Sequence, residues 1–153
     1  MLKESQISAK LALLRDELEN LISFFEQNLD YNLMVYDLWN AKDILGHITF
    51  WHESFARNIS HLGKGLKPKP LKGKLSEVNN LSVDTTKAVS IQDLIERLKD
   101  AQKVIEEFIF LESISTIPYK KGSREYSREE HLEIVTNHIR KHLQDLRKKY
   151  FKS

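Results

Sequence analysis

Four long segments of the chain repeat their apolar residues at alternating spacings of three and four positions. This spacing matches the period of an α-helix and excludes the strict alternation of a half-buried β-strand. We therefore expect helices over about 5–28, from about 40 to 62, over 90–108 and over 127–150. The stripes that should face a shared core are Ile7, Leu11, Leu14, Leu18, Leu21, Phe25 and Leu29; Ala41, Ile44, Ile48, Trp51, Phe55 and Leu62; Leu94, Leu98, Ala101, Ile105 and Phe108; and Leu132, Val135, Ile139, Leu146 and Tyr150. The pattern predicts an all-α fold, a four-helix bundle.

Polar residues at the expected starts of three of these helices support this assignment. In each case, a side chain that can accept from free backbone N–H groups is followed three positions later by an acidic residue. The pairs are Asn40 with Asp43, Ser90 with Asp93, and Ser127 with Glu130. These pairs set the expected beginnings of the second, third and fourth helices.

The segment over 63–89 separates the second and third expected helices and shows no helical period, because Gly, Pro and Lys interrupt it. A connection of this length can span a bundle, so that the third helix begins at the same end as the second. This predicts an up-down-down-up topology with a long crossover connection between helices 2 and 3. A simple up-down-up-down bundle with a surface loop is the alternative. No repeat or second domain is visible, so 1–153 should form a single domain.

Composition argues against several classes of protein. The chain has no cysteine, which excludes disulfides, thiolate catalysis and Cys-containing zinc sites. The formal net charge is only +2, which by itself does not indicate an anionic partner. Lysines are frequent over 64–74, but no aromatic residues lie among them, so we expect no specific nucleic-acid binding. Without a signal-peptide core or an apolar run of spanning length, a cytoplasmic protein with no membrane association is expected.

Two histidines one helical turn apart, His138 and His142, are the leading candidates for a functional site. Positions i and i+4 share one face of a helix, so both imidazoles can bind one ion. His47 lies beside Ile44 and Ile48 on the second expected helix and can supply a third ligand. Three neutral imidazoles leave at least one position of a divalent ion open, which is typical of catalytic metal sites. The alternative for each residue is a core histidine that bonds to a backbone carbonyl.

The other three histidines are not expected to bind this ion. His131 shares the helical face of His138, but the two lie about 10 Å apart along the axis at about 1.5 Å per residue. His52 should point away from His47 around its helix, and His61 lies near the end of that helix. We therefore expect His52 and His61 to face solvent.

Two carboxylates lie about one turn from a proposed ligand, and they are our candidate catalytic residues. Asp43 and Asp145 could act as general bases or could orient the histidines. The structural explanations are stronger, because a helix cap already explains Asp43 and a charged surface explains Asp145. Lys120, Lys121 and Arg124 in the last connection could bind an anionic substrate, although a solvated loop also explains them.

The segment LWNAKDILGHITFWHE resembles the second helix of the DinB-like superfamily, where a Trp, an acidic position and a His precede an aromatic residue. NHIRKHLQDL resembles the H-x-x-x-H motif on the last helix of that superfamily, and the long connection after helix two is also similar. The resemblance covers nearly the whole chain. It implies an up-down-down-up bundle with a metal site formed by His47, His138 and His142, and the expected ion is Zn, Ni, Mn or Fe.

The chain departs from the pattern of many members of this superfamily around the last ligand. Those members have a His directly before the ligand and Gly-Gln shortly after it, whereas this chain has Lys141 before His142 and Leu143-Gln144-Asp145 after it. The resemblance implies that metal binding is retained and that the substrate chemistry differs.

The resemblance implies a metal-dependent hydrolase or a small-thiol S-transferase that acts on a small molecule. A low-molecular-weight thiol would be the partner in the second reaction. The alternative is a non-enzymatic protein of the ClbS/DfsB type, which sequesters a toxic small molecule or confers resistance to it. Phe24 and Phe50 lie outside the predicted core stripes and are candidates for a homodimer interface.

Overall fold

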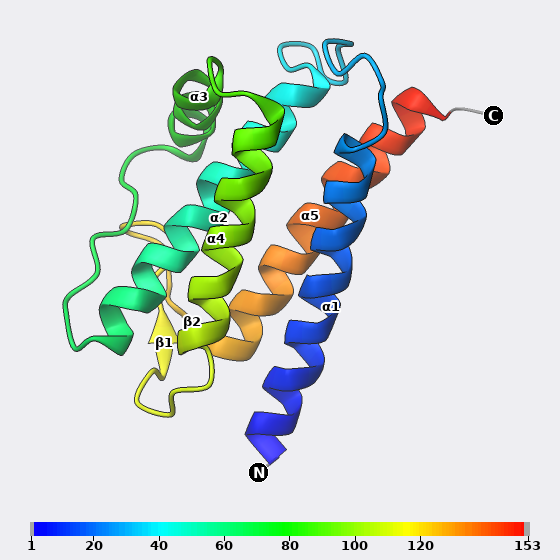
Figure 1. Cartoon of the computed structure of the whole chain (residues 1–153). Helices are drawn as coiled ribbons and strands as arrows, with labels where there is room; N and C mark the ends of the chain where they lie inside the picture. The colour runs from blue at the N-terminus through cyan, green and yellow to red at the C-terminus, as the bar shows by residue number, and fades with distance from the viewer. Residues whose placement is uncertain (1, 152–153) are drawn as a thin grey trace.

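The computed structural model describes residues 2–151, which form five α-helices and one short antiparallel sheet of two strands. The elements are α1 (Leu2–Phe25), α2 (Ala41–Gly63), α3 (Leu75–Thr86), α4 (Ile91–Phe108), β1 (Thr116–Ile117), β2 (Tyr126–Ser127) and α5 (Arg128–Tyr150). Four of the helices are long and form the bundle, while α3 lies in the connection between α2 and α4 (Figure 1).

The long helices form two parallel pairs. In Figure 1, α1 runs upward, α2 and α4 run downward side by side, and α5 runs upward beside α1. The segment between α2 and α4 carries the chain back along the bundle, so that α4 begins at the end where α2 began. The predicted up-down-down-up topology with a crossover connection is therefore confirmed.

Part of the crossover connection is helical, which the sequence prediction missed. The α3 helix begins after Lys74 without a side-chain hydrogen bond at its cap, so the usual start signal is absent. Its buried residues Val78, Ser82, Val83 and Thr86 pack against α2. A helix of 12 residues is marginal in isolation, so this packing stabilises α3 more than its intrinsic propensity does.

The predicted starts of α2, α4 and α5 are correct. Asn40 Oδ1 accepts a hydrogen bond from Asp43 N at 2.8 Å, and Asp43 Oδ2 accepts one from Asn40 N at 3.0 Å. Ser127 and Glu130 form the same reciprocal capping box at the start of α5. The α1 helix ends three residues earlier than expected, at Phe25, where the Tyr31 hydroxyl donates to Phe24 O.

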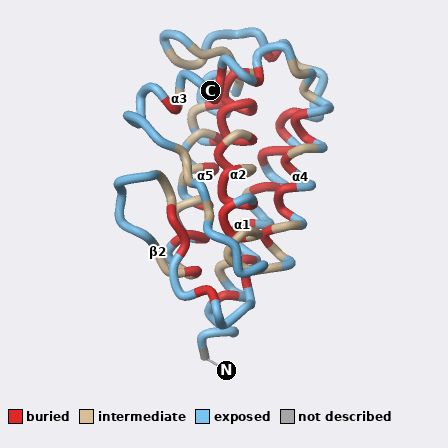
Figure 2. Tube along the Cα trace, turned by 90° about the vertical axis from the view of Figure 1, so that its left-hand side faces the viewer, coloured by how far each residue is buried: buried red, intermediate tan, exposed pale blue. Residues whose placement is uncertain are grey.

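The core lies between the four long helices, and α2 contributes buried residues along most of its length (Figure 2). The inner seam of α5 contains Leu132, Ile139, Leu143 and Leu146, all of which are buried. Leu143, and not His142, takes the seam position between Ile139 and Leu146. His142 lies beside that seam and is only partly buried, which leaves its ring free to reach toward α2.

The aromatic residue Phe24 is part of the core, so the suggestion that it serves a dimer interface is wrong. It is 2% exposed, and its ring packs edge-to-face on Phe25 and Tyr150. The stripe drawn from the sequence passed through Phe25 and left out Phe24, which is buried because the loop after α1 folds back over the helix end.

Gly46 allows the close approach of α3 to α2. A Cβ atom built on Gly46 would lie 2.1 Å from Thr86 Oγ1 and 2.8 Å from Thr86 Cβ. Alanine normally stabilises a helix interior by about 1 kcal/mol relative to glycine. Because of the clash, we expect Gly46→Ala to lower the free energy of unfolding instead, by about 1–3 kcal/mol. Urea denaturation measures this change, with Arg57→Ala on the exposed side of α2 as the control. A stabilised Gly46→Ala protein would contradict this packing.

Candidate metal centre

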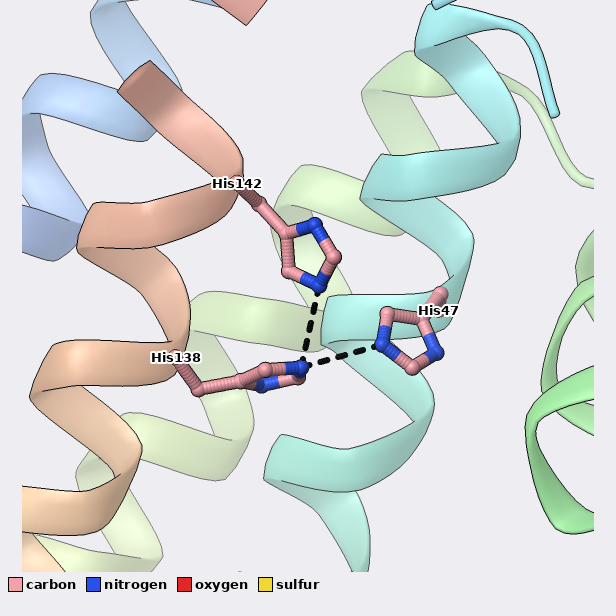
Figure 3. Close-up of side chains that lie close together, drawn as sticks. All are labelled: His47, His138 and His142. Atoms are coloured by element: carbon pink, nitrogen blue, oxygen red, sulfur yellow. Dashed lines mark hydrogen bonds between the residues drawn. The ribbon is translucent and has the colours of Figure 1, made fainter. Parts of the chain in front are cut away.

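Three imidazole rings meet between α2 and α5 (Figure 3). His47 extends from α2, and His138 and His142 extend from successive turns of α5. The Nε2 atom of His138 lies 3.0 Å from Nε2 of His47 and 3.0 Å from Nε2 of His142. Three imidazoles around one tetrahedral zinc ion at about 2.0–2.1 Å would place their nitrogens about 3.3 Å apart. Two of the three nitrogen pairs are therefore close to the spacing of a metal site, and the three ligand atoms, which the sequence predicted to converge, all lie within 4.8 Å of one another.

Hydroxyl groups fix the tautomers of two of these rings. The Ser82 hydroxyl on α3 donates its proton to Asn79 O. In its contact of 3.0 Å with His47 Nδ1 the hydroxyl oxygen can therefore only accept, so the ring N–H is the donor. The Tyr36 hydroxyl donates to Asp145 Oδ2 at 2.6 Å and must likewise accept from His142 Nδ1 at 2.9 Å. Both rings therefore carry their proton on Nδ1, which leaves an Nε2 lone pair on each.

The lone pairs of His47 and His142 both point at His138 Nε2, which has at most one proton to donate. When all three rings are neutral, at most one of these two contacts can be a hydrogen bond. A cation between the rings would accept all three lone pairs at once. A hydrogen bond from the far nitrogen that leaves Nε2 free is also the usual arrangement of a metal-binding histidine. The donor set therefore fits a divalent ion.

Burial keeps these imidazoles neutral. Burial, together with the neighbouring rings of His138 and His142, lowers the pKa of His47 to about 2. Burial also lowers the pKa of His138 and that of His142 to about 4. Neutral imidazole is the form that binds a metal, so at neutral pH no proton competes with the ion.

Of the two predicted carboxylates, one is connected to the histidines. Asp145 lies behind Tyr36, which links it to His142. Burial alone would raise the pKa of Asp145, but hydrogen bonds from Tyr36 and Lys141 outweigh it and the net pKa is lowered. Asp43 is held in the cap of α2 and lies 3.7 Å from Lys87 Nζ, and no hydrogen bond joins it to His47, His138 or His142 within residues 2–151.

Two further residues of the site, Tyr36 and Ser82, were missed from the sequence, and a third, Trp39, belonged to the family resemblance but was given no role. Tyr36 and Trp39 lie in the loop between α1 and α2, and Ser82 lies on α3. The Trp39 ring centroid lies 4.8 Å from that of His47, where it covers one side of the cluster. No periodic or motif signal marks Tyr36 or Ser82, because contacts between distant segments bring them to the histidines.

The prediction that His52 faces solvent is wrong. His52 is 2% exposed, and its Nε2 atom lies 2.8 Å from Gln102 Oε1 on α4. His52 does point away from His47 around α2, but that side of α2 packs against α4 and does not face solvent. His61 is partly buried near the end of α2. His131 is buried and is not part of the three-histidine group.

The Tyr36 hydroxyl is expected to tune metal affinity. Tyr36→Phe removes the group that holds the His142 ring and connects it to Asp145. Loss of such a supporting hydrogen bond typically weakens metal binding by about 10–100-fold. Competition with a chromophoric chelator measures the affinity, and Tyr126→Phe, a partly buried tyrosine outside the cluster, is the matched control. Equal affinities for the two variants would show that the hydroxyl does not support the site.

The surface chemistry of the chain is mixed. None of the helices in the part of the chain that the structure describes combines the length and apolar character needed to cross a membrane.

The lysines of the crossover connection come close to those of the β1–β2 turn. Lys121 N donates to Leu71 O at 2.7 Å, and one cavity is lined by Lys67, Lys69, Lys72 and Lys120.

Comparison with known proteins gives a fold but no sequence relative. No protein-family profile and no curated protein sequence matches the chain. The crystal structure of the mycothiol-dependent maleylpyruvate isomerase is similar with a TM-score of 0.73 at 13% sequence identity. A histidine-to-alanine mutant of the same enzyme gives a TM-score of 0.70 at 11% identity. Each match covers 92% of this chain and 60% of the isomerase, so the chain spans about three fifths of that protein. The chain therefore has the helical-bundle fold of this isomerase, and it is the fold that the resemblance to the DinB-like superfamily implied.

Proposed function

We propose that the chain is a divalent-metal enzyme that activates a small thiol and joins it to, or removes it from, a small-molecule substrate. The observation that carries this proposal is the convergence of three Nε2 atoms, two of which have tautomers fixed with the lone pair inward. His47, His138 and His142 would hold the ion. When bound, the ion supplies Lewis acidity that lowers the pKa of a thiol or water at its open position.

The similarity of fold supports the thiol reaction over hydrolysis. The two similar solved structures are of an enzyme described as mycothiol-dependent. The chain itself has no cysteine, so the sulfur nucleophile would come from a free thiol. Hydrolysis is the second reaction that a three-histidine site can support, and the same assays test it.

The residues around the histidines have assignable roles. Burial and the neighbouring Asp145 raise the pKa of Tyr36, so its hydroxyl stays protonated and donates to that carboxylate. Asp145 then acts through Tyr36 to orient the His142 ring, and we assign it as a positioning residue. Asp43 has no comparable connection to the histidines, and the cap of α2 accounts for its contacts.

Metal stoichiometry and thiol binding test the proposal directly. Apo protein would be reconstituted with Zn, Ni, Mn or Fe(II), and the bound metal measured by elemental analysis. Protein loaded with Co(II) would then be titrated with cysteine, glutathione and mycothiol. We expect about one ion per chain and a new sulfur-to-cobalt charge-transfer band with at least one thiol. Consumption of that thiol in the presence of a panel of small electrophiles then identifies the reaction.

Two results would overturn the proposal. Failure of every ion to bind after reconstitution would favour the alternative of a sequestering or resistance protein, in which the histidines are polar groups of a pocket. Stoichiometric metal without a charge-transfer band, together with ester or amide cleavage, would assign hydrolysis instead of thiol transfer.

A further inference from the structure

A second group of buried polar atoms lies next to the three-histidine cluster, in a cavity between α2, α5 and the turn after β1. The cavity is lined by His52, His131 and His138, the last of which also belongs to the three-histidine cluster. Aromatic rings form much of its wall. Trp51 stacks on Tyr119 with ring centroids 4.9 Å apart and planes 9° apart, and the Phe55 ring lies 4.1 Å from that of His131.

The His52 ring has an unsatisfied acceptor. Glu106 accepts from Arg15 and from Gln102 Nε2, so the amide nitrogen of Gln102 faces Glu106 and the amide oxygen faces His52. His52 must therefore carry its proton on Nε2 in order to donate to that oxygen. Its Nδ1 atom then has a free lone pair, and it has no partner among residues 2–151 although it is buried.

His131 provides a second buried atom of the same kind. Its Nδ1 atom also has no hydrogen-bond partner in the described chain. Burial lowers the pKa of His52 to about 4 and that of His131 to about 3, so both rings are neutral at pH 7. An unpartnered buried polar atom costs about 1–3 kcal/mol, so two of them along one cavity indicate that something else fills their hydrogen bonds.

The shape of the cavity limits what can enter it. It encloses about 420 Å³ of space between atoms, part of it continuous with solvent, but only about 20 Å³ is wide enough for the centre of a water molecule. The space is thus a narrow crevice. This space holds one water or one hydroxyl group, so a larger occupant has to move the side chains of the wall, and a flat group moves them least.

The chemistry of the walls limits the occupant further. None of the residues that line the cavity carries a formal charge at neutral pH. A charged group would remain unpaired there, at a cost of several kcal/mol. A hydroxyl group can donate to His52 Nδ1 and still accept a hydrogen bond from a neighbouring ring N–H, such as that of His131. Stacked aromatic walls favour a planar, unsaturated ligand.

We propose that this cavity binds the second substrate of the enzyme as a planar, uncharged group with a hydroxyl donor, and that His52 and His131 recognise the hydroxyl. The proposal rests on the proposed function only in calling the occupant a substrate. With the hydroxyl at His52 and His131, the rest of the group extends along the crevice toward His138. His52 and His131 would then determine specificity without binding the ion.

Phenol and anisole form a matched pair of probes for this cavity. Both are flat and uncharged, but only phenol has a hydroxyl donor. Their affinities for metal-free and zinc-loaded protein would be measured by NMR titration, together with the ¹⁵N shift of His52 Nδ1. We expect phenol to bind about 10-fold more tightly than anisole, which corresponds to one buried hydrogen bond. Phenol should also move the His52 Nδ1 resonance in the direction of hydrogen-bond acceptance.

The same titration on His52→Phe tests the recognising atom. We expect the preference for phenol over anisole to disappear in this variant. His61→Phe, on the same helix but outside the cavity, should keep the wild-type preference. The phenol to anisole ratio and the ¹⁵N shift of the wild-type protein do not depend on whether His52→Phe folds.

Three outcomes would overturn the proposal. These are equal binding of phenol and anisole, an unchanged preference in folded His52→Phe, and a bound water at His52 that saturating phenol does not displace. Metal content is measured separately from probe binding. If the protein binds phenol through His52 but takes up no metal, the pocket proposal stands and the proposed function is rejected. If it takes up metal but does not bind phenol through His52, only the pocket proposal is rejected.

Discussion

His47→Ala is expected to lower the metal content of the reconstituted protein from about one ion per chain to near zero. His47 is the ligand contributed by α2, and its ring is 2% exposed and oriented by Ser82. Without it, His138 and His142 remain as two ligands on one helix, and a site with two imidazoles no longer joins α2 to α5. Loss of a ligand should exceed the 10–100-fold effect that is typical of losing a supporting hydrogen bond.

The same substitution should abolish thermal stabilisation by the metal. An ion at 100 times its dissociation constant stabilises the folded state by about 2.7 kcal/mol. For a domain of this size, that corresponds to a rise in Tm of about 5–11 °C. We expect added zinc to raise the Tm of the wild-type protein and of His61→Ala, which changes a histidine outside the cluster, but not the Tm of His47→Ala. Equal metal content and equal shifts in the two variants would rule out His47 as a ligand.

Metal-free protein is expected to unfold steeply in mild acid. Burial lowers the pKa of five histidines, with values of about 4 or below in the folded state: His47, His52, His131, His138 and His142. In the unfolded chain their pKa is about 6.5, so below that pH the unfolded state binds more protons. The free energy of unfolding therefore falls as the pH drops from about 6.5 toward 4. Above about pH 7 these groups no longer change it with pH.

The size of this effect is large compared with the stability of a typical domain. At pH 5.5, each of these histidines lowers the free energy of unfolding by about 1.4 kcal/mol, and five lower it by about 7 kcal/mol. Domains of this kind have about 5–15 kcal/mol in total. Circular dichroism should therefore show a transition between about pH 4 and pH 6 with several protons taken up. A transition that takes up only one proton would contradict the burial of these rings.

A single substitution tests whether the buried histidines cause the acid transition. His131→Phe removes one of the five groups and should lower the pH of the midpoint by about 0.2 units, since four protons instead of five then drive unfolding. His61→Phe is the comparison, because His61 is only partly buried and lies outside the group of five. An unchanged midpoint for His131→Phe would show that this ring is already accessible to protons in the folded protein.

The helical period and the helix caps predicted most of the fold. Capping is a local interaction, so Asn40 with Asp43 and Ser127 with Glu130 could be recognised from neighbouring residues. The metal ligands were also predictable in part, because His138 and His142 lie on the same face through a local geometric rule. The pairing of His47 with them relied on the family resemblance as well as on its helical position.

Other features depend on contacts that the sequence order does not reveal. Ser82 reaches His47 only because α3 packs on α2 at Gly46, and the helical character of α3 itself follows from that packing. The burial of His52 follows from the position of α4, and a view of α2 alone gives the opposite answer. Tyr36 lies in a loop whose path is set by non-local contacts.

The contact between His47 and His138 joins residues that lie 91 positions apart in a chain without cysteine. An ion bound by both residues would act as a reversible cross-link that closes a loop of more than half of the polypeptide. In the chain-entropy picture, closing a loop of this length removes about 4–5 kcal/mol of conformational freedom from the unfolded chain. A chelator added during refolding would then behave as a reducing agent does toward a disulfide-bonded protein.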